Sequence, residues 1–94
     1  MASPKITIYS TQTCPFCKME KSYLDEKKVS YQNVYVDQDD NAREEMMAHT
    51  HQRGVPVTLL EYPDGEKRAF IGFQKELLDS ALSGEKVGDS WGSQ

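Results

Sequence analysis

This sequence of 94 residues lacks long apolar runs and an excess of positive charge. No apolar run approaches the roughly 20 residues that a membrane-spanning helix needs, and the chain does not open with a charged and then apolar leader. The 11 Lys and Arg residues are outnumbered by 15 Asp and Glu, which gives a net charge of −4 with neutral histidines. Because nucleic acids and acidic membranes attract local positive charge, neither partner is expected. Without a predicted membrane span or leader, the expected location is cytoplasmic.

Cysteine is also scarce, because the chain has only Cys14 and Cys17. In a reducing compartment such a pair is rarely a structural disulfide, and a bridge across so short a loop restricts the unfolded chain by only about 2 kcal/mol. Zinc needs four ligands, and there is no second cysteine pair. The only histidines, His49 and His51, have an H-x-H spacing outside the usual finger pattern. We therefore expect no metal site.

Hydrophobic periodicity and turn residues predict seven elements in the order β-α-β-α-β-β-α. Runs that are β-branched or alternate in polarity indicate strands, and apolar residues spaced three and four apart indicate helices. The predicted strands cover residues 5–9, 31–36, 57–60 and 67–71, and the predicted helices cover about 15–28, 41–51 and 74–82. The run Y-P-D-G-E at 62–66 predicts the turn of an antiparallel hairpin.

The connections between these elements predict an α/β fold. A strand-helix-strand unit has a right-handed crossover, and its two strands are parallel. With the hairpin added, the expected architecture is a four-stranded mixed sheet flanked by helices. Residues 1–82 are expected to form this single domain, and the Gly- and Ser-containing residues 83–94, with Trp91, are expected to be a flexible tail.

The two cysteines lie where the first predicted strand meets the first predicted helix, in the motif T-C-P-F-C at 13–17. Unpaired N–H groups and the positive dipole end of a helix N-terminus favour a thiolate, so Cys14 is the expected nucleophile. Cys17 lies one turn further, and its sulfur leans back toward Cys14. Cys14 is expected to meet solvent and attack a disulfide, after which Cys17 attacks Cys14 and releases the reduced target. Lys18 either adds a positive charge near the thiolate or is an ordinary exposed lysine.

Three motifs occur together in this chain: T-C-P-F-C-K-M at 13–19, G-V-P-V-T at 54–58 and G-F-Q-K-E-L at 72–77. In this order they resemble the glutaredoxin family of the thioredoxin-like superfamily, and the resemblance covers about residues 5–82. It implies a thioredoxin-like fold and a thiol-disulfide oxidoreductase. Since the cysteine pair is itself the redox centre, no organic cofactor is required, and glutathione is one candidate reductant.

The resemblance also implies roles for residues beside the cysteine pair. The Val55–Pro56 peptide bond is expected to be cis and to face Cys14, so that the Val55 backbone pairs with an extended substrate, as in strand addition. Arg53 matches the family and is expected to meet a substrate carboxylate. The remaining expected substrate-binding residues are Pro15, Phe16, Gly72 and Phe73, of which Phe73 either contacts the partner or packs against the last helix.

Departures from the family pattern concern the glutathione site. Glutathione-dependent members typically have a basic residue three positions before the first cysteine, where this chain has Thr11, and an aspartate where it has Lys75. Lys75 is expected to repel the α-ammonium group of glutathione. The Gly-Phe pair at 72–73 is more similar to the NrdH-redoxins, which take electrons from thioredoxin reductase or a similar protein.

The sequence therefore predicts a monomeric electron donor to protein disulfides, similar to the NrdH-redoxins, with ribonucleotide reductase as the acceptor that this similarity suggests. One alternative is a glutathione-dependent dithiol glutaredoxin. A second is a carrier in which Cys14 and glutathione hold an iron-sulfur cluster between two subunits. Pro15 and the weakened glutathione site argue against that carrier.

Overall fold

The computed structural model describes residues 4–50 and 54–90, and a mixed β-sheet runs through the centre of that part of the chain. Its strands are β1 (Lys5–Ser10), β2 (Gln32–Tyr35), β3 (Val57–Glu61), β4 (Lys67–Ile71) and β5 (Asp89–Ser90). The helices are α1 (Pro15–Glu26), α2 (Asp40–Thr50) and α3 (Lys75–Leu82). The strand order is β2-β1-β3-β4-β5, in which β1 and β2 are parallel and the other neighbouring pairs are antiparallel. The first seven elements have the predicted order.

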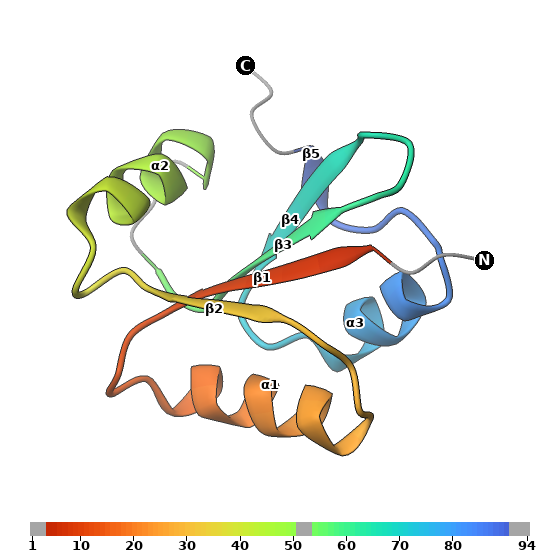
Figure 1. Ribbon diagram of the computed structural model, residues 1–94, viewed down its shortest axis with the longest axis horizontal. Coiled ribbons are helices and arrows are strands. Elements are labelled where there is room, and N and C mark those ends of the chain that lie inside the picture. Colours follow the sequence, from red (N-terminus) through yellow and green to blue (C-terminus); the bar gives the residue numbers. More distant parts are fainter. Residues whose placement is uncertain (1–3, 51–53, 91–94) are drawn as a thin grey trace.

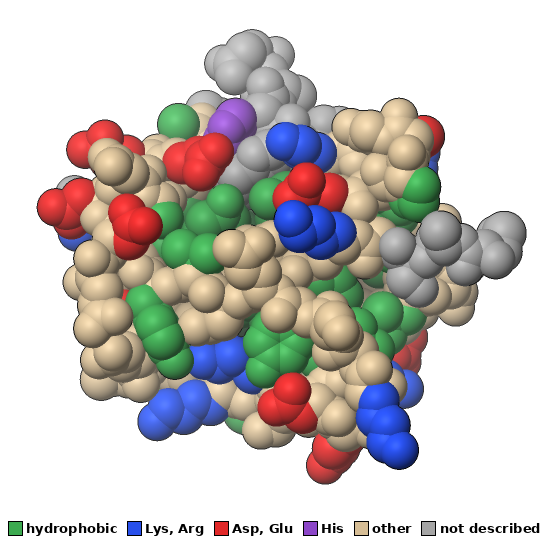
Figure 2. Space-filling model, viewed as in Figure 1, with side chains coloured by type: hydrophobic (Ala, Val, Ile, Leu, Met, Phe, Trp, Pro, Cys, Tyr) green, Lys and Arg blue, Asp and Glu red, His purple; other side chains and the backbone are tan. Residues whose placement is uncertain are grey.

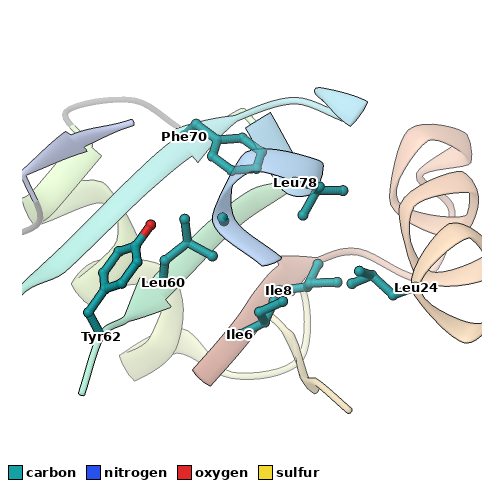
Figure 3. Packing of buried hydrophobic residues seen from close by; sticks show 8 residues of the cluster. Ile6, Ile8, Leu24, Leu60, Tyr62, Phe70 and Leu78 are labelled. Carbon is teal, nitrogen blue, oxygen red and sulfur yellow. The ribbon is translucent and has the colours of Figure 1, made fainter. Parts of the chain in front are cut away.

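Helices cover both faces of the sheet, with α1 and α3 on one face and α2 on the other (Figure 1). Side chains of a strand alternate between the two faces, so Ile6 and Ile8 of β1 pack toward α1 and α3, whereas Tyr9 packs on the α2 side. The larger core cluster joins the sheet to Leu24 of α1 and Leu78 of α3 (Figure 3). The predicted α/β architecture is confirmed.

Residues 84–90 lie against the sheet. Tyr62, which follows β3, donates a hydrogen bond from its hydroxyl to the Glu85 carbonyl oxygen. Arg68 of β4 donates from Nη1 to the Gly88 carbonyl oxygen at 2.6 Å. The two residues of β5 then pair with β4 in antiparallel register.

The sequence predicted a sheet of four strands, whereas the sheet in the structure has a fifth, the two-residue strand β5. The hairpin side chains that hold the segment before β5 lie about 20 positions earlier in the sequence, so no local periodicity indicates their contacts. The structure places residues 83–90 of the expected tail, and their flexibility stays a prediction. Residues 91–94, with Trp91, lie outside the described residues.

Replacing Gly88 by alanine is expected to separate β5 from β4. Gly88 has a φ of +84°, and an added Cβ would lie 2.5 Å from the Ala69 carbonyl oxygen. Backbone strain of this kind costs roughly 1–3 kcal/mol, so amide hydrogen exchange should accelerate in β5 and along the outer edge of β4. The control is Gly65→Ala, because Gly65 also has a positive φ, +94°, but has open space around its Cβ position. Equal acceleration in both variants would contradict a role for the Ala69 contact.

Candidate active site

Cys14 is the N-cap residue of α1. Its backbone is extended, with φ −81° and ψ 115°, and the Cys17 N–H donates a hydrogen bond to Cys14 Sγ at 3.2 Å. Pro15 follows in the first helical turn, where its missing N–H leaves no hydrogen bond unmade. The helix N-terminus thus directs one of its free N–H groups at the sulfur. The Cys14 sulfur therefore accepts a backbone hydrogen bond at the positive end of the α1 dipole.

The two thiols of the motif differ in their surroundings. Cys17 is 0% exposed and Cys14 is 9% exposed, and neither forms a disulfide. Burial, and then the hydrogen bond with the Cys14 side chain, raise the pKa of the Cys17 thiol to about 12. Cys17 is therefore protonated at neutral pH. Cys14 is less exposed than the sequence predicts, and the Val55 carbonyl oxygen lies 3.9 Å from its sulfur.

The loop before β3 lies beside Cys14. Its Val55–Pro56 peptide bond is cis, as the family resemblance implied. Pro56 is buried, and its carbonyl oxygen accepts a hydrogen bond from the Gly72 N–H at 2.7 Å. Gly72 has a φ of +86°, and a Cβ there would meet open space. The structure thus brings together the first cysteine, the Val55 backbone, Pro56 and Gly72 from three separate parts of the chain.

The other expected substrate-binding residues differ in how accessible they are. Phe16 is 58% exposed and stands next to Pro15 at the start of α1. Phe73 is half-buried, with its ring centroid 5.7 Å from that of Tyr23, so it packs against α1. Arg53 lies outside the described residues.

A groove with a volume of about 410 Å³ runs between α1 and the segment that joins β4 to α3, and its lining includes Lys18, Tyr23, Phe73 and Lys75. Lys75 begins α3, and its Nζ lies 5.5 Å from the centroid of the Tyr23 ring. On the face shown in Figure 2, acidic side chains gather over α2, and basic side chains lie along the lower left, over α1.

Glu20 is a feature of the site that the sequence analysis missed. This α1 residue is 0% exposed, three positions after Cys17. The Thr58 hydroxyl of β3 donates a hydrogen bond to Glu20 Oε2, whereas the buried Oε1 has no hydrogen-bond partner among the described residues. Burial raises the pKa of the Glu20 carboxyl to about 7, although the Thr58 hydrogen bond lowers it. The available signal was its spacing from Cys17 and from Leu24, which places a carboxyl on the inner face of the helix.

The described residues also bear on the expectations about a metal site and a membrane-spanning helix. Within residues 4–50 and 54–90, no group of three or more His, Cys, Asp or Glu side chains is arranged to hold a metal ion. Among the helices of those residues, none combines the length and the apolar character needed to cross a bilayer. His51 lies outside the described residues.

Comparison with known proteins identifies the family. The Glutaredoxin family model matches residues 6–60. An uncharacterized glutaredoxin-like 8.6 kDa protein in the rubredoxin operon of Clostridium pasteurianum is 42% identical over 77 residues, which cover 82% of this chain and 96% of the relative. The chain belongs to the glutaredoxin family. Glutaredoxins are generally thiol-disulfide oxidoreductases.

Solved structures resemble this glutaredoxin over most of its length. Methanoredoxin from Methanosarcina acetivorans is 27% identical, with a TM-score of 0.73 and 85% of each chain covered. The glutaredoxin-like protein NrdH-redoxin from Escherichia coli is 24% identical, with a TM-score of 0.67 and with 80% of this chain and 91% of that chain covered. At this level of identity, the similarity to NrdH-redoxin concerns the fold alone. The predicted thioredoxin-like fold is confirmed.

Proposed function

We propose that this glutaredoxin transfers electrons from the Cys14–Cys17 dithiol to disulfides in other proteins. The observation that carries this proposal is the hydrogen bond of 3.2 Å from the Cys17 N–H to Cys14 Sγ, at the N-cap of α1. It stabilises one thiolate, and the same helical turn holds a second, fully buried thiol. A nucleophilic sulfur with a protected neighbour is what a two-step thiol-disulfide exchange requires.

In the first step, the Cys14 thiolate attacks one sulfur of the target disulfide, and the other target sulfur leaves as a thiolate. The product is a mixed disulfide between Cys14 and the target. In the second step, the Cys17 sulfur attacks Cys14 Sγ, the mixed disulfide breaks, and the target leaves with both of its sulfurs reduced. The Cys14–Cys17 disulfide that results is then reduced by two electrons from the donor.

The substrate is proposed to bind beside Cys14 as an extended segment. The Val55 backbone lies next to the Cys14 sulfur, and backbone pairing of this type is a common mode of peptide recognition. Phe16 offers an exposed aromatic ring at the start of α1. Gly72 leaves open space for a close approach of the partner backbone. Arg53 is the proposed contact for a carboxylate of the partner.

We propose a flavoprotein of the thioredoxin reductase class as the electron donor, with ribonucleotide reductase as one candidate acceptor. The NrdH-redoxin of Escherichia coli is described as having a thioredoxin-like activity profile, and the Gly-Phe pair at 72–73 supports a similar role here. Lys75 places a positive charge at the start of α3, where it disfavours the ammonium group of glutathione. The second candidate is a glutathione-dependent glutaredoxin, which the Val55 backbone and Arg53 leave open.

The test of donor choice is insulin-disulfide reduction with either thioredoxin reductase or glutathione and its reductase as the electron source. Faster turnover with the flavoprotein reductase is expected. If the unmodified protein turns over faster with glutathione, the NrdH-redoxin-like assignment is wrong and the glutathione-dependent function replaces it. No disulfide reduction with either source would contradict the proposed function altogether.

Exchanging Lys75 for aspartate, together with Thr11→Lys, is expected to raise glutathione-dependent activity about tenfold. Each exposed charge pair contributes roughly 0.2–1 kcal/mol, and about 1.4 kcal/mol corresponds to a tenfold change in affinity. The measurement is the glutathione concentration that gives half-maximal turnover. Lys28→Asp is the matched control for the first exchange, because Lys28 is an exposed lysine after the other end of α1. An equal gain in the control would show that net charge, rather than position, controls glutathione use.

A further inference from the structure

We propose that Glu20 accepts the proton of Cys17 when Cys17 attacks the mixed disulfide. This inference rests on the proposed function, because it names the base for the second step of that exchange. Glu20 would be a buried proton acceptor supplied by the same helix that carries both cysteines.

The geometry of α1 supports this assignment. Cys17 and Glu20 are both 0% exposed and lie three positions apart in the helix. Residues at this spacing are neighbours on the helix surface. Since helical side chains point back toward the N-terminus, the Glu20 carboxyl extends toward the turn that carries Cys17.

The hydrogen bonds of the carboxyl leave one oxygen available. Oε2 accepts from the Thr58 hydroxyl, which holds the carboxyl in place from β3. Oε1 is buried, and among the described residues it has no hydrogen-bond partner. A buried polar atom without a partner is destabilising, so its presence next to the cysteine pair calls for a functional explanation. Acceptance of a proton at Oε1 provides one.

Among the described residues, the groups around Glu20 carry no positive charge that would hold its carboxyl ionised. From α1 it is faced by Cys17, and from β3 by the uncharged Thr58 hydroxyl. The next helix residue, Lys21, directs its Nζ to a tyrosine hydroxyl of β2 at 3.4 Å. In the part of the chain that the structure describes, no ion pair joins Glu20 to a basic side chain.

The two acidities require the proton to move while the Cys17 sulfur attacks, because the pKa of the thiol lies far above that of the carboxyl. The Cys17 thiol, with a pKa raised to about 12 chiefly by burial, needs a base as it becomes a nucleophile. The Glu20 carboxyl, with a pKa raised to about 7 by burial, is substantially ionised near neutral pH and is a stronger base than an exposed carboxylate. The Glu20 charge also contributes to the raised pKa of Cys17, so the two groups interact.

The step balances in atoms, electrons and charge. The Cys17 S–H bond breaks, its proton goes to Glu20, and its electron pair forms the bond to Cys14 Sγ. The bond between Cys14 and the target sulfur breaks, and the target leaves as a thiolate. One negative charge is present before the step, on Glu20, and one after it, on the target. When the donor reduces the pair again, Glu20 returns the proton to Cys17.

Stopped-flow mixing of the reduced 94-residue protein with one equivalent of Ellman's reagent separates the two steps. The first thionitrobenzoate released reports attack by Cys14, and the second reports resolution by Cys17. In the unmodified protein the second phase should accelerate as the pH rises through about 7, because Glu20 must be ionised to accept a proton. Glu20→Gln should slow this phase about 100-fold at mildly alkaline pH and remove that midpoint, while the first phase changes little.

Two further variants separate proton transfer from structural damage. Thr58→Val removes the hydrogen bond that lowers the Glu20 pKa, so the midpoint of the second phase should move to higher pH while a fast plateau remains. Glu26→Gln makes the same chemical change at an exposed position of α1 and should leave both phases unchanged.

The outcomes distinguish this inference from the function on which it rests. The inference is overturned if the second phase in Glu20→Gln is as fast as in the unmodified protein, or faster. Such a result would mean that the carboxylate does not assist Cys17 and, if the phase is faster, that its charge hinders ionisation of the thiol. An unchanged midpoint in Thr58→Val also overturns it. The proposed function survives both results as long as the unmodified protein releases the second thionitrobenzoate. Absence of a second phase in the unmodified protein overturns the proposed function itself.

Discussion

Replacing Cys14 by serine is expected to abolish disulfide reduction, whereas Cys17→Ser should still form a mixed disulfide with the target and then retain it. The difference follows from the position of each sulfur. The Cys14 sulfur accepts a hydrogen bond from the Cys17 N–H and is the more accessible of the two sulfurs. Cys17 is fully buried, and the pKa of its thiol is about 12. Without Cys14 no nucleophile is available to a partner, and without Cys17 the intermediate has no internal route to release.

Mass spectrometry under non-reducing conditions measures both results. Cys17→Ser incubated with an oxidised target should accumulate as an adduct of one target molecule, and Cys14→Ser should remain unmodified. Alkylation of the reduced, unmodified protein with iodoacetamide is the control, because it involves no substitution. Faster labelling of Cys17 than of Cys14 would contradict the assignment of roles.

Replacing Glu20 by glutamine is expected to stabilise the protein by about 3 kcal/mol at mildly alkaline pH. Burial raises the pKa of this carboxyl from 4.5 to about 7 in the folded protein, and each pKa unit corresponds to about 1.4 kcal/mol. Between these two values the folded state binds more protons than the unfolded state, so the stability of the unmodified protein falls as the pH rises. The contribution is fully present below the unfolded pKa and is lost once the pH exceeds about 7.

Urea unfolding of the reduced protein at about pH 4.5 and at about pH 8 measures this effect. The difference in unfolding free energy between Glu20→Gln and the unmodified protein should be small at the lower pH and reach about 3 kcal/mol at the higher one. Glu26→Gln is the control, because Glu26 is exposed on the same helix. Equal stability of the Glu20 variant and the unmodified protein at both pH values would show that the carboxylate is not destabilised by burial.

A stabilising effect of this substitution would complement the proposed catalytic role. A carboxylate kept in a buried position at the expense of stability is characteristic of functional sites. The two measurements are independent, because one follows unfolding and the other follows resolution by Cys17. Together they distinguish a buried residue that serves the reaction from one that only weakens the fold.

Local sequence patterns were sufficient to predict the order of the first seven elements, the parallel pair of β1 and β2, the antiparallel hairpin of β3 and β4, and the place of the cysteine pair. The expectation that strands joined through a helix are parallel is wrong for β2 and β3, because β3 is antiparallel to β1. The correctly predicted features depend on residues that are close in the sequence: the alternation in β1, the apolar spacing in α1, the turn at 62–66 and Pro15 after Cys14. The three family motifs then indicated which distant segments meet, and the contact between Cys14 and Val55 agrees with them.

Contacts between distant segments set the remaining features. The spacing of Glu20 from Cys17 and Leu24 places its carboxyl on the inner face of α1, but the hydrogen bond that it accepts from Thr58 of β3, 38 positions later in the chain, has no local signature. The addition of β5 depends on Tyr62 and Arg68 reaching backbone oxygens about 20 positions further on. The low exposure of Cys14 likewise depends on how the fold covers it. Helical spacing can place a polar residue on an inner face, but the extent of its burial is a property of the packed chain rather than of the residue.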